Sequence, residues 1–246
     1  MLFRDYSGSG TSGPGKELEI TRTRKTTNYF KSLSRKDYIV KASNIISEEG
    51  IEAVSIRRIA TELGCSSTSM YRYFKNLDEL LFYTQLTALN EYILQLSIHE
   101  KNWKDNWEMY FEIWHIYAIE AFRNPYAFEY VFYRNIKSEN LEDSLKDYYA
   151  MFPDTIIKVS PLIQEMLEVP GYYDRDFVIW KHLVKEKEIT EENARKLNHI
   201  FCNLFLGYFK ALQEQGLSGC DPKVLTDQFV SEIREIAACY TGNKNL

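Results

Sequence analysis

The chain has 246 residues, with 30 Lys and Arg, 35 Asp and Glu, and a formal net charge of −5 at pH 7. It contains no run of about 18 apolar residues and no hydrophobic signal region at its N-terminus, so we expect a cytoplasmic protein with no membrane span. The four cysteines are scattered without CxxC spacing, which argues against a disulfide framework and against a zinc site.

The net charge differs in sign between the two parts of the chain. Residues 1–80 carry 13 Lys and Arg against 10 Asp and Glu, a net +3, whereas the remainder carries 17 against 25, a net −8. Because the split is modest, chance is the alternative explanation. The asymmetry favours a nucleic-acid-binding face in the N-terminal part, with an acidic body held away from phosphate.

Residues 1–34 are predicted to form a flexible, basic N-terminal extension. Ser7–Gly15 contains only Ser, Gly, Thr and Pro, which cannot bury a core. Between Lys16 and Lys36, seven basic residues outnumber the two acidic ones. Such an arm either lies along phosphate or in a minor groove of DNA, or is only a solvated leader.

Residues 35–81 predict three short helices and the start of a fourth, with a helix-turn-helix in the middle. The first helix spans about Arg35–Glu49, and the second opens at Ser55, a good N-cap. Gly64 ends the second helix, where a left-handed conformation favours glycine. The apolar residues of the second helix repeat at the spacing of one buried face: Ile56, Ile59, Ala60 and Leu63.

The third helix, capped by Ser66, turns Met70 and Phe74 inward and leaves its other side chains outside. In a helix-turn-helix, the N-terminal half of this second element enters the major groove. Arg72 suits direct readout, because a guanidinium pairs bidentately with guanine. The predicted DNA-binding residues here and on the flanking segments are Arg57, Arg58, Ser67, Thr68, Ser69, Tyr71, Arg72, Tyr73 and Lys75. For the two arginines of the preceding helix, simple solvation is the alternative.

This segment resembles the DNA-binding domain of the TetR family of bacterial transcriptional regulators. The resemblance lies in Glu48–Gly50, Ser55–Ala60, Leu63–Ser66, Met70–Phe74 and Leu77–Leu80. It implies that the tyrosines of Met70–Phe74 reach phosphate or bases, with partial burial as the alternative. It also implies a dimer bound to a palindromic operator. The family often has a phosphate-contacting lysine where this chain has leucine at the start of Leu77–Leu80, so that contact is not expected.

The fourth helix is predicted from Asn76, an N-cap, to about Ile98, with Glu79 completing a capping box. Its apolar positions suit a helix that touches two domains. In the family that the chain resembles, this helix transmits ligand binding to the DNA-binding heads.

Residues 82–246 are predicted to form an all-α effector-binding and dimerisation domain. The pattern stays helical between proline and glycine breaks, and no sustained alternation of period two is present. We expect helices near residues 103–122, 126–137, 141–151, 154–168, 174–187, 191–214 and 222–240.

The last two of these helices carry a broad apolar face. In the TetR family two such helices form the dimer interface, so the resemblance implies a homodimer; packing into their own domain is the alternative. The predicted interface residues are Leu197, Phe201, Leu204, Phe205, Tyr208, Leu225, Phe229 and Ile233.

The middle of the chain is rich in aromatic residues, which are more often core than ligand cage. Two of the helices nevertheless carry aromatic side chains and histidines that could line an apolar cavity with a few polar groups. Such a cavity suits a hydrophobic or aromatic effector. The predicted ligand-binding residues are Trp114, His115, Tyr117, Trp180 and His182.

An enzyme is not expected. The four histidines lie far apart without metal-ligand spacing, and neither a phosphate-cradling glycine loop nor a nucleophile elbow is present. No cofactor or metal is predicted. The favoured hypothesis is a dimeric, ligand-responsive repressor. The alternatives are a DNA-binding protein of the same fold that acts through protein partners or DNA architecture, and a helical interaction module that does not bind DNA.

Overall fold

The computed structural model describes residues 33–133, 141–169, 171–215 and 221–243, and residues 1–32 of the predicted basic extension lie outside this part. The described residues contain helices and no β-strand, which confirms the all-α prediction. The α-helices are α1 (Arg35–Glu49), α2 (Ile56–Leu63), α3 (Leu77–His99), α4 (Asn106–Arg123), α5 (Pro125–Phe128), α6 (Leu141–Met151), α7 (Pro161–Glu168), α8 (Tyr172–Lys185), α9 (Glu191–Gln215) and α10 (Pro222–Thr241).

Short helices of other types connect several of these elements. Three are 3₁₀-helices, η1 (Ile51–Ala53), η2 (Ser67–Arg72) and η4 (Pro153–Thr155), and the segment η3 (Glu129–Tyr133) is π-helical. The predicted third helix of the N-terminal region is therefore η2, wound more tightly than an α-helix. We call residues 33–76, which hold α1, α2 and η2, the head.

Local signals in the sequence define the ends of the head helices. The Ser55 hydroxyl accepts the backbone N–H of Arg58, and the Asn76 side chain accepts the backbone N–H of Glu79, as N-caps do. Gly64 ends α2 with a φ of 64° in the left-handed region. The predicted Ser55 and Asn76 caps and the predicted glycine stop are confirmed. Two other predictions are wrong: Ser66 makes no side-chain cap hydrogen bond, and the Glu79 carboxylate accepts the backbone N–H of Lys75 instead of closing a capping box on Asn76.

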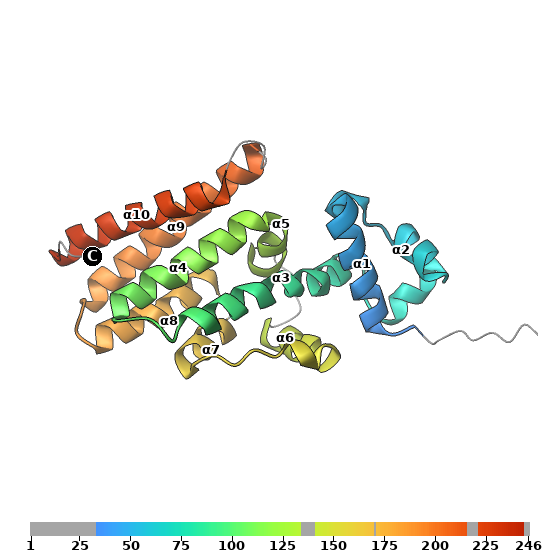
Figure 1. Ribbon diagram of the computed structural model, residues 1–246, viewed down its shortest axis with the longest axis horizontal. Helices are drawn as coiled ribbons and strands as arrows, with labels where there is room; N and C mark the ends of the chain where they lie inside the picture. The colour runs from blue at the N-terminus through green and yellow to red at the C-terminus, as the bar shows by residue number, and fades with distance from the viewer. Residues whose placement is uncertain (1–32, 134–140, 170, 216–220, 244–246) are drawn as a thin grey trace, which may run out of the picture. The chain divides into compact units, whose positions relative to one another are not determined.

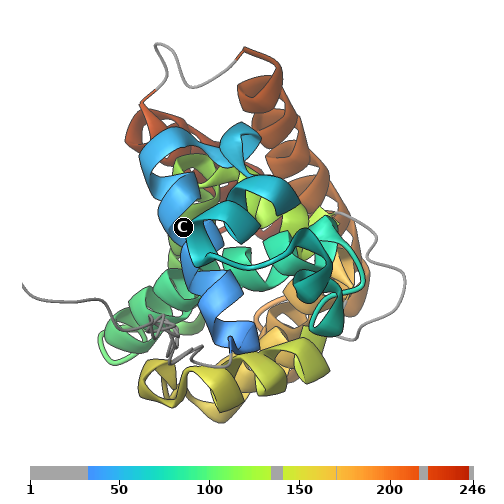
Figure 2. The same ribbon diagram turned by 90° about the vertical axis from the view of Figure 1, so that its right-hand side faces the viewer.

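Helix α3 joins the head to the body, which we define as residues 100–243. Every residue from Glu79 to Leu86 is buried, because α1 packs on α3 and so do α4, α5 and α6. Figures 1 and 2 show α3 running from the head into the other helices. In the body, α8 packs on α9 and α10 packs on α4. None of the described helices has the length and apolar character needed to cross a membrane.

Two helix predictions in the body differ from the structure. The segment predicted as a helix over residues 154–168 is α-helical from Pro161 only, because Ser160 is extended before the proline and the ring suits the first helical position; residues 154–155 belong to η4. The segment 126–137 is split between α5 and η3, and residues 134–140 lie outside the described part.

Most of the apolar face of α9 and α10 is buried against other helices of the same chain. Of the predicted interface residues, those fully buried against neighbouring helices are Leu197, Phe201, Phe205, Phe229 and Ile233. Leu204, Tyr208 and Leu225 are only partly buried. The first group packs into its own domain, as the alternative to a dimer interface predicts.

We expect Gly64→Ala to lower the free energy of unfolding by about 1 kcal/mol, because an alanine pays a steric cost in the left-handed conformation. A Cβ at this position would meet no atom within 4 Å, so the cost comes from the backbone alone. Urea unfolding followed by circular dichroism measures the change. Gly64→Asn is the matched control and should cost less, because asparagine tolerates this conformation; equal costs would contradict the backbone explanation.

Candidate nucleic-acid interface and internal cavity

Segment η2 presents a small set of side chains to solvent. Thr68, Tyr71 and Arg72 are exposed, and 55% of the surface of Tyr71 is accessible. Ser67 is half-buried, and the Thr68 hydroxyl lies 2.9 Å from the hydroxyl of Ser66. Inward-pointing Met70 and Phe74 are buried as predicted and hold the segment on the head core.

Two of the predicted DNA-binding residues turn into the head instead. Ser69 accepts a hydrogen bond of 2.9 Å from the buried Tyr38 hydroxyl and donates to the carbonyl of Ser66. The Tyr73 hydroxyl donates to the carbonyl of Leu33, and its ring centroid lies 5.5 Å from that of Tyr38. These contacts orient η2 on α1 and leave Ser69 and Tyr73 only partly exposed.

Some basic residues of the head form ion pairs, and others do not. Residues 33–81 hold seven Lys and Arg and seven Asp and Glu, so the positive excess of residues 1–80 belongs to the N-terminal extension. Arg58 pairs with Glu62 at 2.5 Å and with Glu49 at 2.6 Å, and these carboxylates raise the pKa of Arg58. Exposed Arg57 and Arg72 form no ion pair with any described residue. Lys75 follows η2 in the sequence, and its side chain is exposed.

Arg35 joins the head to the body. Its guanidinium lies 3.1 Å from Glu79 on α3 and 3.3 Å from Asp147 on α6. It also lies 3.9 Å from the ring centroid of Tyr83, whose hydroxyl donates to Asp147 at 3.3 Å. Sequence reasoning missed this junction, because the two carboxylates are far from Arg35 in sequence.

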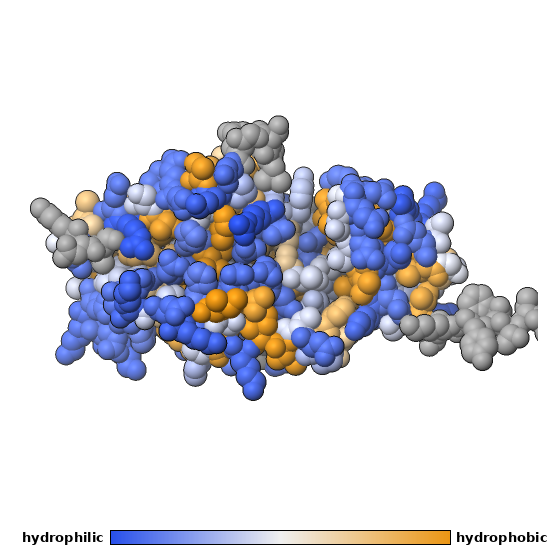
Figure 3. All heavy atoms as spheres, in the orientation of Figure 1, coloured by the Kyte–Doolittle hydropathy of each residue, from blue (hydrophilic) through white to orange (hydrophobic). Residues whose placement is uncertain are grey.

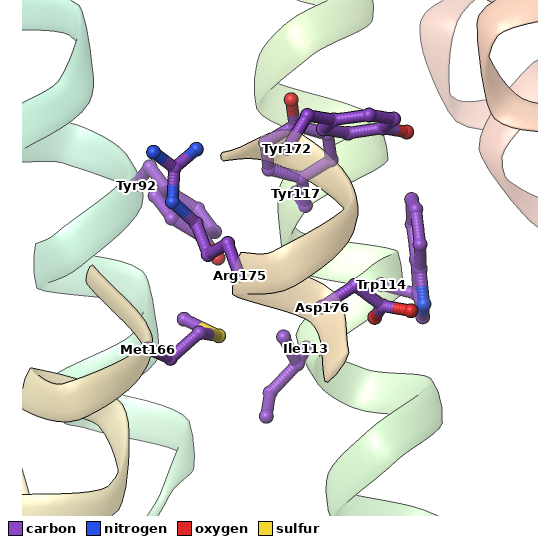
Figure 4. Close-up of a pocket in the computed structure, with 8 residues that line it drawn as sticks. All are labelled: Tyr92, Ile113, Trp114, Tyr117, Met166, Tyr172, Arg175 and Asp176. Carbon is purple, nitrogen blue, oxygen red and sulfur yellow. The ribbon is translucent and has the colours of Figure 1, made fainter. Parts of the chain in front are cut away.

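A small cavity lies inside the body between α3, α4, α7 and α8 (Figure 4). Its volume is about 30 Å³, well below the roughly 300 Å³ of ordinary small-molecule pockets. Its walls are mostly aromatic, with one arginine and one aspartate. The lining residues are Tyr92, Ile113, Trp114, Tyr117, Met166, Tyr172, Arg175 and Asp176.

The structure brings together only part of the predicted ligand-binding set. Trp114 and Tyr117 line the cavity, whereas the fully buried Trp180 lies behind it and donates to Asp176 at 2.9 Å. His115 is 3.5 Å from Asp227 on α10, and His182 is 3.2 Å from the Asn106 side chain. The two histidines therefore hold helices together at the edge of the body.

Sequence reasoning missed the charged residues of the cavity. A signal was present: Tyr172, Arg175, Ile179 and Leu183 follow the spacing of one helix face, and the last three are buried. A charged residue within such an apolar face indicates a buried charge. No group of His, Cys, Asp and Glu in the described ranges is arranged to hold a metal ion.

A second hollow is larger. It lies between α3, α6 and α7, with a volume of about 510 Å³, and apolar side chains gather over this region in Figure 3. Its charged side chains, Lys146, Lys158 and Glu168, are exposed on its rim. The internal cavity is the stronger candidate because it holds buried polar groups.

Residues 39–84 match the family model described as bacterial regulatory proteins, tetR family. A stretch of 72 residues is 38% identical to an HTH-type transcriptional regulator of Staphylococcus aureus (strain bovine RF122 / ET3-1) and 35% identical to one of strain USA300. Each alignment covers 29% of this chain and 37% of the relative's length. A protein with unknown function from Rhodococcus sp. RHA1 has a similar fold, with a TM-score of 0.52 at 13% identity over 85% of this chain and 97% of that one.

We expect Tyr73→Phe and Tyr71→Phe to act differently, although each removes one hydroxyl. Tyr73→Phe removes the bond to the Leu33 carbonyl and should lower the free energy of unfolding by about 1 kcal/mol. Tyr71→Phe should leave stability unchanged, because this side chain is exposed. Thermal unfolding of the two variants measures the difference. A larger loss for Tyr71→Phe would reverse the assignment of inward and outward residues.

Proposed function

We propose that this chain belongs, through its helix-turn-helix segment, to the TetR family of bacterial regulatory proteins, and that it is a sequence-specific, DNA-binding transcriptional regulator. In this proposal it is a repressor that binds a palindromic operator as a homodimer and is released by a small-molecule effector. Two relatives that match over 72 residues are named HTH-type transcriptional regulators.

The observation that carries the proposal is that η2 and α2 expose polar and basic side chains that form no ion pair with a described residue. Arg57 and Arg72 are exposed while Lys41 and Arg58 are paired with carboxylates of the head. An unpaired guanidinium is ready to pair with phosphate or with a guanine edge. In this proposal Arg72 reads bases, with Thr68 and Tyr71 beside it, and Arg57 and Lys75 contact phosphate.

The proposed dimer uses the outward faces of α9 and α10. Leu204 and Leu225 are partly buried, and Val224 is 61% exposed, so these helices still carry apolar surface outside the chain core. A dimer raises the affinity of a small head by presenting two of them to the two halves of an operator.

The effector signal is proposed to travel along α3. Tyr92 of the cavity wall and Tyr83 of the Arg35 junction lie nine residues apart on this helix, about 13 Å along its axis. Because α3 is buried where the head meets the body, a shift of Tyr92 would move Tyr83 and the bound Arg35. The head orientation would then change with the state of the cavity.

The small volume of the cavity favours a second candidate, a DNA-binding protein of the same fold that has no small-molecule ligand. Such a protein would act through protein partners or DNA architecture. Both candidates require the same DNA-binding surface, so they differ only in the response to effectors.

Selection of bound sequences from random duplex DNA, with the full chain, tests the shared part of the proposal. We expect a palindromic motif, bound by two chains per site and weakened by salt as phosphate contacts require. Arg72→Ala should relax preference at particular base pairs at a cost of about 1–3 kcal/mol. Failure to enrich any palindrome would refute the regulator proposal, and an equal loss on all sequences would make Arg72 a phosphate contact.

We expect Asp147→Asn to weaken operator binding about two- to five-fold without changing the preferred sequence, because an exposed ion pair contributes at most about 1 kcal/mol. Asp147 is 62% exposed and links α6 to the head through Arg35. Asp143→Asn on the same helix is the matched control, since it changes net charge equally but removes only a contact with Lys146. Fluorescence anisotropy on the selected operator compares them; equal losses would show that only net charge matters.

A further inference from the structure

The second hollow, between α3, α6 and α7, has the size of a small-molecule site. Its volume of about 510 Å³ lies within the roughly 300–1,000 Å³ of ordinary ligand pockets, whereas the internal cavity lies well below that range. Such a hollow suits an apolar chain if its walls are apolar, because binding then removes apolar surface from water. The aliphatic side chains in its walls are those of Ile93, Leu145, Ile156, Ile157, Val159 and Leu167.

The segment that joins η4 to α7 carries hydrogen-bond donors beside these apolar walls. Its residues 156–160 belong to neither helix, and residues 156–159 line the hollow. The backbone N–H groups of Ile157, Lys158 and Val159 form no hydrogen bond with any described residue. The next N–H group, that of Ser160, donates to Glu100 at 3.0 Å. Three consecutive backbone donors are therefore available to an acceptor from outside the chain.

The charges around the second hollow favour an anion. The exposed ammonium group of Lys158 forms no ion pair with a described residue, whereas that of Lys146 lies 4.0 Å from Asp143. The carboxylate of Glu168, also in the lining, accepts a hydrogen bond from Gln164 at 2.8 Å. Lys158 and the backbone donors next to it are therefore the groups that a bound carboxylate would meet.

We propose that the second hollow binds an anionic amphiphile, an aliphatic chain that ends in a carboxylate. The chain packs against Ile93, Leu145 and Leu167. The carboxylate accepts hydrogen bonds from the Lys158 ammonium group and from the neighbouring backbone N–H groups. This site is separate from the internal cavity, because the two have no described lining residue in common.

Helix α6 connects the proposed site to the head. Leu145 and Tyr149 of α6 line the hollow. Asp147 lies between them in sequence, 3.3 Å from Arg35 of α1. An aliphatic chain inserted beside Leu145 and Tyr149 displaces α6, because closely packed side chains leave little room for an added group. The bound acid therefore weakens the contact between Asp147 and Arg35; this effect on DNA binding rests on the proposed regulator function, whereas the binding of the acid does not.

Isothermal titration calorimetry with the full chain tests binding without DNA. The probes are hexanoate, octanoate and decanoate, each below its micelle concentration and each with its primary amide, which keeps the chain and removes the charge. We expect decanoate to bind most tightly, with about a ten-fold loss for each pair of methylenes removed and at least a ten-fold loss for the amide. Equal affinity of acid and amide, affinity independent of chain length, or no binding at millimolar concentration would overturn the inference. Binding to phosphatidylglycerol vesicles without binding of the monomeric acids would make this face a membrane surface and would also overturn it.

Two variants locate the bound acid. Lys158→Gln removes the ammonium group, and Ile156→Asp adds a like charge to the apolar wall, so each should weaken decanoate binding about ten-fold. Both side chains are exposed, and 58% of the surface of Ile156 is accessible, so the fold should tolerate these changes. Lys181→Gln and Ile98→Asp are the matched controls: they make the same substitutions at exposed positions outside the lining and should leave the affinity unchanged. Wild-type affinity in both Lys158→Gln and Ile156→Asp would place the acid elsewhere and overturn the site.

Operator binding tests the connection through α6 separately. Saturating decanoate should weaken binding to the selected operator about two- to five-fold, the same loss as Asp147→Asn, because both act through one exposed ion pair. Asp147→Asn should remove this response, and Asp143→Asn should retain it. An unchanged response in Asp147→Asn would refute the route through α6 while the calorimetry still supports the site. Absence of a palindromic operator would refute the regulator proposal alone, because the calorimetry measures the acid without DNA.

Discussion

One helix, buried from several sides, is the constraint on which the structure depends. α3 has every residue from Glu79 to Leu86 inside the protein, because α1 packs on it together with α4, α5 and α6. A helix held in a close-packed interior cannot turn or slide without moving its neighbours. The same helix supplies Tyr92 to the cavity wall and Tyr83 to the Arg35 junction. The head and the cavity therefore share one rigid element.

Ion pairs and hydrogen bonds occupy several of the charged side chains that lie between helices. In the head, Glu49 and Glu62 occupy Arg58, and Glu79 and Asp147 occupy Arg35. All of these contacts except Arg58–Glu62, which lies within α2, fasten one helix to another. In the body, the carboxylate of Asp176 accepts hydrogen bonds from side chains of α4, α8 and α9. Arg175, one residue away, lies in the wall of the aromatic cavity and donates to the Val169 carbonyl.

The amino-acid sequence predicts features that depend on neighbouring residues, and it does not predict contacts between distant ones. The caps Ser55 and Asn76 and the stop at Gly64 follow from bonds within a few residues, and the structure has all three. The sequence pattern predicts that Ser69 and Tyr73 point outward, as on an exposed α-helix face. In the 3₁₀ geometry of η2, residues three apart share a face, so Tyr73 follows the buried Met70 inward. The Arg35 junction joins residues more than 100 positions apart and has no local signal.

Helix periodicity, caps and turns are properties of short stretches, so the amino-acid sequence alone predicts the all-α class, the helix-turn-helix and the residues from which the proposed DNA contact is drawn. The tertiary structure decided which of those residues remain exposed, which apolar faces of α9 and α10 are already buried, and where the cavity lies. These outcomes depend on which helices meet. Arg175 lies within an apolar helix face in the sequence, but only the packing of α3, α4 and α7 against α8 makes it the cation of a cavity.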